Sequence, residues 1–584
     1  MPQALQQAAA ALQRGDGAQA ERICRQVLTE RPGQFEALYL LGIAAGQAGR
    51  TAEALDWMSR AVQAQPRHAD AQFNLGVALG ELGRHEEAIA AYGRALALEP
   101  ARADAHYNCG VALDALQRVD EALAAYERAI TVAPSHAEAH HNRGVALARL
   151  DRNVEALAAF DRALALRPQY AAAHNHRGAA LAALERFDEA LAAYDRALAG
   201  APRYAQAHNH RAMVLLDLDR PAEALESADR ALTLASTFAD AWYTRGNALR
   251  ELYRHADAAE SFERAIALDP DHASAHWNLA DCRLVLGDFA RGWEQFEWRW
   301  RLPSRGQARR QFTQPQWTGA ERLEGRTILL HAELGLGDTL QFCRFATEVA
   351  RRGARVLLEA QPPLLPFLHT LEGVASLVAR GDPLPPFDLH CPLMSLPLAL
   401  RADVAGIAAR VPYLASDPAR VAAWRERLGA ARAPRIGLAW SGSQGLRNDK
   451  RSTTLRQVLP LLDPGIEWVS LQKEVPATDA AMLAAHPGIR DVSANLADFA
   501  DTAALVEVLD LVITVDTSVA HVPGALARPV WILLPHNPHD WRWLLEREDS
   551  VWYPTARLFR QPAPGDWESV VRRVRAEIGA RFDV

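Results

Sequence analysis

Lysine is nearly absent from this sequence. Of the 64 basic residues in the 584-residue chain, Lys450 and Lys473 are the only lysines, and both lie in one short region. Arginine supplies all the other basic side chains, so the two lysines are candidate functional residues.

Cysteine and long apolar runs are also scarce. The five thiols are scattered without C-x-x-C spacing, which gives no sign of a disulfide framework or a zinc site. No run reaches the roughly eighteen apolar residues that a membrane span needs. The first residues lack a basic region followed by an apolar core. We therefore expect a cytoplasmic protein without membrane insertion.

Charge and composition exclude other classes of protein. A formal net charge of −7 gives no reason to expect nucleic acid or an anionic membrane surface as a partner. The 49% hydrophobic and 23% charged residues are typical of soluble globular proteins. A chain of 584 residues exceeds what a single core holds, so several domains are expected.

A period of 34 residues runs through the first half of the chain. Glycine or alanine recurs at this interval at Ala8, Gly42, Gly76, Gly110, Gly144, Gly178, Ala212, Gly246 and Ala280. Alanine follows twelve residues after each of the first eight markers, and an aromatic or large residue usually follows four residues later. Proline closes most units, where a second helix must end.

This pattern resembles the tetratricopeptide repeat, a helix-turn-helix unit, with eight full repeats and an atypical ninth in residues 1–305. The resemblance implies an α-solenoid. In the ninth unit Gly292 replaces the alanine, and tryptophan and phenylalanine fill the second helix. We expect these aromatic residues to form a hydrophobic joint to the next domain.

Polar residues recur two positions before the markers. The series consists of Asn74, Asn108, Asn142, His176, His210, Thr244 and Asn278. In the repeat superhelix of O-linked N-acetylglucosamine transferases, this position carries an asparagine ladder that holds an extended peptide. The resemblance therefore implies that the four asparagines bind a protein acceptor on the concave face, because a carboxamide offers donors and an acceptor to any peptide unit. The alternative is that they only bond neighbouring helices.

Histidines form a second series two positions earlier. They are His106, His140, His174, His208 and His276. Their spacing places them in different repeats, so we expect packing and solvated histidines and no metal site.

Alternating strands and helices follow an arginine-rich connector at 306–325. Strands are expected near 327–332, 355–359 and 374–378, then near 435–440, 467–471, 511–515 and 530–534. Two such series favour two Rossmann-like lobes that face each other across a cleft, at 326–415 and 416–584. The second lobe is expected to end in an amphipathic helix over 566–581.

The stretch 327–345 predicts a strand, a glycine turn and a helix. The turn ends in Gly337 and Asp338 at the carboxyl end of the strand, where open α/β sheets bind ligands. Glycine lets a substrate approach the backbone closely. Asp338 is a candidate catalytic group, and the alternative is that it is an ordinary N-cap.

A second buried strand ends at Asp516, Thr517 and Ser518. Thr517 or Ser518 can cap the next helix while its free amides point into the cleft, which makes an anion site. The segment from Asp516 to His521 resembles the D-T/S-G-x-x-H signature of bacterial heptosyltransferases, inverting enzymes of the two-lobed glycosyltransferase B fold. The Gly337-Asp338 turn resembles their first-lobe G-D motif.

This second resemblance covers roughly residues 326–560, with two departures. Ser518 stands where heptosyltransferases have glycine, and Pro523 lies within the helix. Because proline interrupts a helix, we expect this helix to start late or to kink.

The loop that starts at Trp440, Ser441 and Gly442 is a candidate phosphate cradle. It ends in Lys450 and Arg451, and glycine, hydroxyl groups and two cations suit a pyrophosphate. Lys450 also stands where the resemblance places a phosphate-binding basic residue. The alternative is a solvated basic loop. Lys473, after the next strand, is expected at the edge of the nucleotide base or ribose.

These patterns together imply an inverting, metal-independent glycosyltransferase. It would move a sugar from a nucleotide-sugar to a protein held by the repeats, without a further cofactor. Asp338 would be the general base, Lys450, Arg451, Thr517 and Ser518 would stabilise the leaving phosphate, and His521 would face the nucleotide or sugar.

Two alternatives stay open: a scaffold whose transferase half has decayed, and a transferase that acts on lipopolysaccharide or lipid-linked sugar. The sugar, the nucleotide, the acceptor and the oligomeric state are also open.

Overall fold

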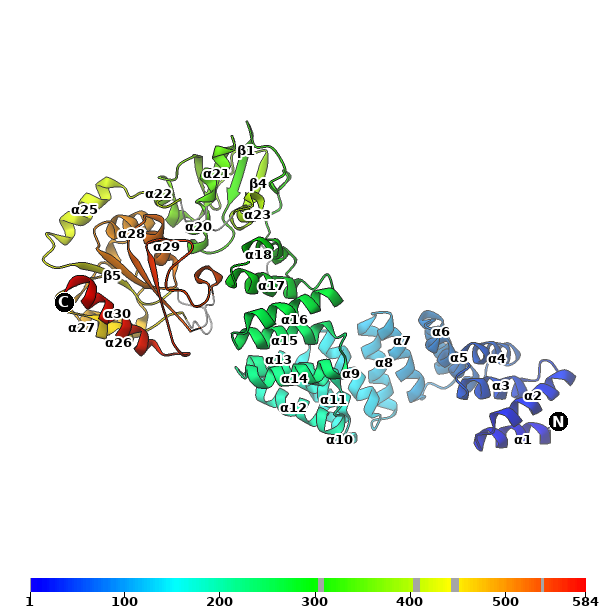
Figure 1. Ribbon diagram of the computed structural model, residues 1–584. Helices are drawn as coiled ribbons and strands as arrows, with labels where there is room; N and C mark the ends of the chain where they lie inside the picture. Colours follow the sequence, from blue (N-terminus) through cyan, green and yellow to red (C-terminus); the bar gives the residue numbers. More distant parts are fainter. Residues whose placement is uncertain (1, 303–308, 403–409, 443–450, 537–539) are drawn as a thin grey trace. The chain divides into compact units, whose positions relative to one another are not determined.

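The structure is a computed structural model that describes residues 2–302, 309–402, 410–442, 451–536 and 540–584 (Figure 1). By internal packing the chain divides into two compact units, Met1–Thr244 and Arg245–Val584. The second unit contains the last repeats together with the α/β half. The domain boundaries expected at 305, 325 and 415 stay predictions.

Helix pairs make up the repeats. The helices are α1 (Pro2–Gln13), α2 (Gly17–Glu30), α3 (Phe35–Gln47), α4 (Thr51–Ala64), α5 (Ala69–Glu81), α6 (His85–Leu98), α7 (Ala103–Ala115), α8 (Val119–Val132), α9 (Ala137–Arg149), α10 (Asn153–Leu166), α11 (Ala171–Ala183), α12 (Phe187–Gly200), α13 (Ala205–Asp217), α14 (Pro221–Leu234), α15 (Ala239–Glu251), α16 (His255–Leu268), α17 (Ala273–Val285) and α18 (Phe289–Phe296), then the 3₁₀ helix η1 (Glu297–Arg301). The second helix of most repeats ends two residues before its proline, because proline lacks the N–H that the next turn needs.

The glycine period has a steric cause. In four repeats a β-carbon at the marker glycine would lie 2.6 Å from the aromatic ring sixteen positions later, namely Gly76 with Tyr92, Gly110 with Tyr126, Gly144 with Phe160, and Gly178 with Tyr194. Glycine therefore leaves the space that the ring fills in a close-packed interior. Where the marker is Ala8 or Ala212, the partner sixteen positions later is small, Cys24 or Ala228.

The histidines that lie two positions before the polar series form hydrogen bonds between consecutive repeats. Each histidine Nε2 lies 2.9 to 3.1 Å from the carbonyl oxygen of the proline six residues earlier: His106 and Pro100, His140 and Pro134, His174 and Pro168, His208 and Pro202, His276 and Pro270. Gln72 and Trp242 make the same bond at the same position of their repeats. A side-chain N–H is the shared requirement, so the expected packing role takes the form of a specific inter-repeat hydrogen bond.

Two parallel sheets form the α/β half. The first has the strand order β3-β2-β1-β4, and the second has the order β10-β9-β8-β5-β6-β7. The strands are β1 (Thr327–His331), β2 (Arg355–Ala360), β3 (Val374–Ala379), β4 (Leu389–Pro392), β5 (Arg435–Ala439), β6 (Glu467–Ser470), β7 (Ile489–Asp491), β8 (Leu511–Val515), β9 (Val530–Leu534) and β10 (Ala556–Arg560). Their mostly apolar, buried runs are typical of parallel sheets.

The seven strands expected from the sequence are confirmed, whereas β4, β7 and β10 are not predicted by its pattern. β4 lies in a proline-rich passage and β7 has only three residues, which is too short to show a period. β10 carries Arg557 and Arg560 at two of its five positions. These charges hide it from a search for apolar strands.

Helices connect the strands. They are α20 (Leu336–Phe342), α21 (Phe345–Arg351), η2 (Pro362–Leu364), α22 (Leu365–Leu368), η3 (Leu393–Ser395), α23 (Leu396–Leu400), α25 (Pro418–Leu428), α26 (Leu455–Val458), η4 (Leu459–Leu461), α27 (Ala477–Ala485), η5 (Ser493–Asn495), α28 (Phe499–Val506), α29 (Ser518–Ala525), η6 (Trp541–Trp543) and α30 (Trp567–Phe582). The expected C-terminal helix is α30, and Asp566 caps it by accepting from the Ser569 N–H at 3.0 Å.

An aromatic cluster joins the last repeat to the α/β half, as expected. The ring of Trp293 in α18 lies edge-on to Trp541 and Phe342, with ring centroids 5.1 and 5.9 Å away. Phe289 packs edge-on to Trp552 at 5.8 Å. Because all these rings belong to one buried cluster, the last repeat and the α/β half share a core.

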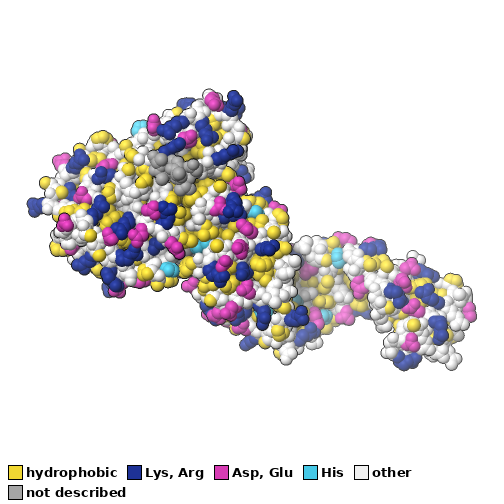
Figure 2. Space-filling model, viewed as in Figure 1, with side chains coloured by type: hydrophobic (Ala, Val, Ile, Leu, Met, Phe, Trp, Pro, Cys, Tyr) yellow, Lys and Arg dark blue, Asp and Glu magenta, His cyan; other side chains and the backbone are white. Residues whose placement is uncertain are grey.

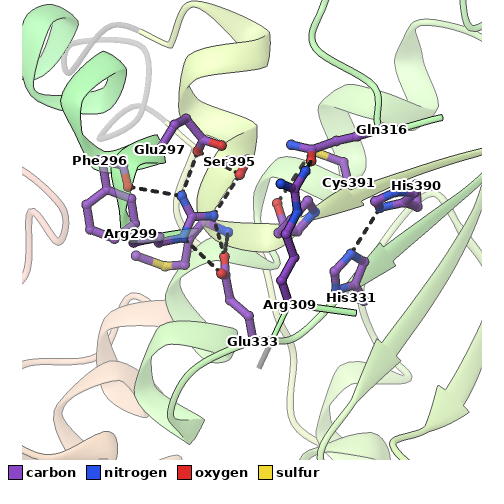
Figure 3. Close-up of polar contacts among 12 residues, drawn as sticks. Phe296, Glu297, Arg299, Arg309, Gln316, His331, Glu333, His390, Cys391 and Ser395 are labelled. Carbon is purple, nitrogen blue, oxygen red and sulfur yellow. Dashed lines mark hydrogen bonds and ion pairs between the residues drawn. The ribbon is translucent and has the colours of Figure 1, made fainter. Parts of the chain in front are cut away.

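A buried ion-pair network reinforces this joint (Figure 3). Arg299, only 1% exposed, pairs with Glu333 at 3.0 Å and with Glu297 at 2.7 Å. Its Nη2 also donates to the Ser395 hydroxyl at 2.8 Å. Two carboxylates and a hydroxyl compensate the cost of burying this guanidinium, so the network fixes η1 against the first sheet.

Three further properties are the length of the apolar helices, the metal-ligating groups and the surface charge. None of the helices in the described ranges is long and apolar enough to cross a bilayer. Across the parts of the chain that the structure describes, no three His, Cys, Asp or Glu side chains are arranged to hold a metal ion. Basic and acidic side chains are interspersed on the face shown in Figure 2.

Candidate functional site

The starts of two helices, α20 and α29, border one cavity. Its volume is about 270 Å³, and it is lined by Gly335, Leu336, Gly337, Asp338, Gly442, Arg451, Asp516, Thr517, Ser518, His521, Asp540 and Arg542. α20 follows β1 and α29 follows β8, so the cavity lies at the carboxyl ends of strands from both sheets. This is the edge where parallel sheets place their ligands.

Asp338 is anchored on both of its oxygens. It is the third residue of α20, and its Oδ2 accepts a hydrogen bond from the Gly335 N–H at 2.8 Å. Its Oδ1 pairs with Arg542. Gly335 is the N-cap, so Asp338 caps the helix from the third position and not as the N-cap residue itself. The same carboxylate lines the cavity.

Arg542 is a site residue that the sequence pattern does not predict. Its side chain is 7% exposed, and Nη1 donates to the two Asp540 oxygens at 2.9 and 2.8 Å. Burial opposes its charge, but Asp540 and Asp338 outweigh burial and raise the pKa of Arg542. The guanidinium therefore stays cationic at the cavity wall. The alternation of opposite charges with tryptophan, in Asp540-Trp541-Arg542-Trp543, is the signal that could have identified it.

α29 presents its first turn to the cavity. The helix begins at Ser518, so the expected late start is wrong. Pro523 falls in the second turn, where it removes one backbone bond, and the helix ends two residues later at Ala525. Thr517 is the N-cap but its side chain makes no capping bond. Main-chain N–H groups at such a helix start attract an anion.

Asp516 is a buried carboxyl group at the end of β8. Burial raises its pKa to about 7, and the charge of Asp540 adds to this effect against the opposing charges of Arg451 and Arg542. It lines the same cavity as Asp338. The cavity thus holds two ion-paired carboxylates, Asp338 and Asp540, and one carboxyl group, Asp516, whose ionisation is disfavoured.

His521 lies in the first turn of α29 beside Gly337. A β-carbon at Gly337 would lie 2.9 Å from His521 Cδ2, so glycine at this position leaves room for the ring. The Nδ1 atom lies 2.8 Å from the Tyr553 hydroxyl oxygen. Burial, with the charges of Arg542 and Arg344, lowers the pKa of His521 to about 3, so the ring is neutral.

A second, more apolar cavity of about 320 Å³ adjoins the first. It shares Leu336, Gly442, Thr517 and Ser518 with it, and adds Pro363, Ala439, Ser441, Leu471, Gln472, Lys473, Glu474, Leu496, Ala497, Asp498, Phe499, Thr502 and Val519. The sequence analysis identifies Ser441 and Lys473 in this set but not Gln472 or Phe499. The two cavities are therefore neighbours with four lining residues in common.

Gln472 and Lys473 are held at this second cavity by main-chain contacts. Gln472 Oε1 accepts from the Ser441 N–H at 3.1 Å, and its amide donates to the Ser441 carbonyl at 2.9 Å. Lys473 Nζ donates to the Ser493 carbonyl at 3.3 Å. The Gln472 bonds fix the end of β6 against the end of β5, and the Lys473 bond ties the same loop to η5.

The remaining residues of the candidate cradle differ in where they lie. Arg451 and Gly442 line the first cavity. Trp440 lines neither cavity, because its ring is fully buried in the core and donates to Asp479 Oδ2 at 2.8 Å. Lys450 lies outside the described residues, so its expected phosphate contact stays a prediction.

The asparagine series forms hydrogen bonds between repeats. Asn74 and Asn142 donate to the hydroxyl groups of Tyr39 and Tyr107 at 3.1 and 3.2 Å. Asn278 donates to Asn247 at 2.7 Å. The residue that corresponds to Tyr39 and Tyr107 in front of Asn108 is Phe73, which has no hydroxyl group. The bonding that the alternative interpretation predicts is therefore present for three asparagines, and Asn278 is buried.

The first part of the chain matches known repeat families. Residues 11–79, 110–171, 175–237 and 243–296 match models of the tetratricopeptide repeat, and residues 78–117 match a TPR repeat model. The chain from 11 to 296 therefore consists of tetratricopeptide repeats.

Among curated proteins, the chain is similar to Protein FlbA of Caulobacter vibrioides. The two are 28% identical over 323 residues, which is 50% of this chain and 52% of FlbA. The chain thus spans about half the length of this relative, whose name states no activity.

Some solved structures are also similar to this chain. A tetratricopeptide repeat protein from Parabacteroides merdae is 20% identical, with 42% of this chain and 97% of that chain covered and a TM-score of 0.36. YrrB, described as a TPR protein with an unusual peptide-binding site, is 24% identical, with 32% and 95% covered and a TM-score of 0.28.

Proposed function

We propose that the protein is an inverting, metal-independent glycosyltransferase of the glycosyltransferase B type that transfers a sugar from a nucleotide-sugar to a protein acceptor. The observation that supports this most is the adjacent pair of cavities at the carboxyl ends of both sheets. The first cavity combines the carboxylate of Asp338 with a helix start and two arginines, Arg451 and Arg542. This combination suits a donor with an apolar base, a phosphate and a sugar.

The reaction needs a base and a stabilised leaving group. Asp338 accepts the proton of the acceptor hydroxyl, whose oxygen attacks the anomeric carbon of the sugar. The bond from that carbon to the phosphate oxygen breaks, and its electron pair stays on the phosphate. Inversion follows because attack and departure occur on opposite faces of the carbon.

The leaving phosphate is stabilised by groups already in place. The start of α29, from Thr517 to Ser518, offers main-chain N–H groups, and Arg451 and Arg542 add positive charge at the same cavity. Donors that are fixed before the reaction stabilise developing charge without reorganisation. Lys450 is proposed to contribute with them, and no metal ion is needed for this role.

The second cavity suits the base and ribose of the donor. Phe499, Leu471 and Leu496 supply apolar surface, and Gln472 and Lys473 supply polar groups at its rim. A flat aromatic base gains from apolar walls, while a few polar groups fix its orientation.

The repeats are proposed to hold the protein acceptor. Asn74, Asn108 and Asn142 recur at one position of three successive repeats, and Asn278 occupies the same position four repeats later, as a ligand with a repeating backbone requires. The first three side chains are only partly buried, and a carboxamide offers donors and an acceptor for this contact.

Thermal shift with a panel of nucleotides and nucleotide-sugars, carrying one or two phosphates, tests the donor site. A ligand at a hundred times its dissociation constant should stabilise the chain by about 2.7 kcal/mol. We expect at least one to raise the melting midpoint of the wild-type chain and to do so less with Arg451→Ala. No stabilisation by any member of the panel would favour a non-enzymatic scaffold.

A further inference from the structure

His521 and Tyr553 form a buried pair behind the first cavity. The Tyr553 side chain is fully buried, and its hydroxyl oxygen lies 2.8 Å from His521 Nδ1. A β-carbon at Gly524 would lie 2.5 Å from the Tyr553 ring, so Tyr553 packs directly on the backbone of α29. Residues 521 and 524 share one face of this helix, which brings the tyrosine hydroxyl to the imidazole.

The surroundings of His521 fix its charge. Arg542 in η6 and Arg344 at the N-cap of α21 act against a positive charge on the ring, and Asp540 acts in the opposite sense. Burial dominates these effects and lowers the pKa of His521 to about 3. A neutral imidazole has one N–H and one bare nitrogen, so its action in the cavity depends on which nitrogen carries the hydrogen.

The neighbouring hydroxyl groups favour one arrangement. Tyr413 donates its hydroxyl hydrogen to the Leu340 carbonyl at 2.9 Å, which uses that hydrogen. The Tyr553 hydroxyl has His521 Nδ1 as an acceptor at 2.8 Å. When Tyr553 donates to Nδ1, the ring hydrogen of His521 is on Nε2.

The Nε2 atom lies on the side of the ring that borders the cavity. A β-carbon at Gly337 would stand 3.1 Å from it, and both residues line the cavity. Arg451, Arg542 and the start of α29 line the same space, so an Nε2–H group there adds one more donor to a set of donors.

We propose that Tyr553 is a positioning residue that holds His521 as a neutral Nε2–H donor toward a phosphate oxygen of the bound nucleotide-sugar. The proposal rests on the proposed function for the identity of the ligand, but the tautomer is a property of the free chain. The resemblance to heptosyltransferases assigns no partner to this histidine.

Nitrogen NMR on the full chain labelled with ¹⁵N-histidine tests the tautomer without any ligand. Protonated and bare ring nitrogens give well-separated signals, and the His521 signals are those lost in His521→Gln. We expect Nε2 to be protonated and Nδ1 bare in the wild-type chain between pH 6 and pH 8. A hydrogen on Nδ1, or a ring that titrates in this range, would overturn the proposal.

Variants test the functional consequence. Tyr553→Phe removes the hydroxyl group that contacts His521. Tyr413→Phe is the control, because it removes a neighbouring hydroxyl group that bonds the Leu340 carbonyl and the side chains of Tyr553 and Arg344, and leaves the hydroxyl group of Tyr553 beside His521 in place. By analogy with partners that orient metal-bound histidines, we expect Tyr553→Phe to weaken nucleotide binding or slow donor hydrolysis by roughly tenfold or more. Tyr413→Phe should have much less effect.

The variants at His521 itself separate donation from packing. His521→Gln places an amide N–H near the Nε2 position and should retain more affinity than His521→Ala. Equal losses in Tyr553→Phe and Tyr413→Phe would show that Tyr553 acts only by packing, which contradicts the proposal. A wild-type chain with the Nε2–H tautomer that binds no nucleotide would instead contradict the proposed function and leave the positioning by Tyr553 intact.

Discussion

Asp338 and Arg542 form an ion pair between residues 204 positions apart in the sequence. Asp338 comes from the helix that follows the first strand of the first sheet, and Arg542 follows the second-sheet strand β9. Arg542 also pairs with Asp540, and its Nε donates to Gln341. The guanidinium thus holds the candidate base at a fixed place between the two halves of the site.

The first prediction concerns Asp338→Asn. The variant keeps the shape of the side chain but cannot accept a proton as a base, so turnover should fall by roughly two to four orders of magnitude. The affinity for nucleotide should stay close to the wild-type value, because Asp338 is assigned to the acceptor side. The measurements are initial rates and nucleotide affinity on the same preparation.

Asp566→Asn is the matched control for this change. Asp566 also caps a helix through its carboxylate, but it lies at α30 and lines neither cavity. Its replacement should leave turnover unchanged. Near wild-type turnover in Asp338→Asn would remove Asp338 from the mechanism.

The second prediction separates the asparagines of the repeats. Asn142 donates to Tyr107, whereas the equivalent position before Asn108 is Phe73, so the amide of Asn108 has no such tyrosine partner. Asn108→Ala should therefore weaken acceptor binding, by about 0.5 to 1.5 kcal/mol for one lost hydrogen bond, with little change in stability. Asn142→Ala should also lower the melting midpoint.

Acceptor pull-down and thermal denaturation on both variants measure these effects. Tyr107→Phe, which removes only the partner hydroxyl group, serves as the control for the inter-repeat bond. If neither asparagine affects acceptor binding while the helices stay folded, the series is structural and the acceptor is recognised elsewhere.

The third prediction concerns the pH dependence of stability at Asp516. Its pKa is raised from 3.8 to about 7 in the folded chain, so the folded state holds this proton more tightly than the unfolded state. The stability associated with that proton is complete below about pH 4 and is lost as pH rises to about 7. Asp516→Asn is always neutral and lacks this loss.

The melting midpoint of Asp516→Asn should accordingly rise relative to that of wild type as pH increases from 4 to 7. The difference between the two midpoints should then stay constant at higher pH. A difference of roughly 2 °C or more between the midpoints at pH 8 corresponds to a difference of about 1 kcal/mol in the free energy of unfolding for a unit of this size. A midpoint difference independent of pH would contradict the raised pKa.

The fourth prediction is that activity persists in excess chelator. The proposed leaving-group stabilisation comes from Arg451, Arg542 and the start of α29, which are part of the chain. Initial rates with and without chelator check this. Loss of activity that magnesium or manganese restores would show that a metal takes part in stabilising the phosphate.

Much of this architecture follows from the sequence. The 34-residue period predicts the repeats because in five units a glycine must face an aromatic ring, and such a contact repeats in sequence as it does in space. Seven strands are predicted because parallel strands are buried on both faces and read as apolar runs. Asp338, Asp516, Thr517, Ser518 and His521 are predicted as site residues because they stand at the ends of such runs, and they line one cavity.

The residues that the sequence pattern misses depend on long-range contacts. Arg542 reaches Asp338 across the fold, and Tyr553 reaches His521 across α29 and β9, so no local spacing reveals either pair. Trp440 shows the converse case. Its position at the end of a strand suggests a ligand contact, but its ring turns into the core toward Asp479.

The most direct test of the central claim is the release of nucleotide from a panel of nucleotide-sugars by the full chain in the presence of chelator. Wild type should release nucleotide from at least one donor, and Asp338→Asn should release it more slowly by roughly a hundredfold or more. If wild type releases none while its fold is intact, or if Asp338→Asn releases it equally fast, the protein is not the transferase proposed here.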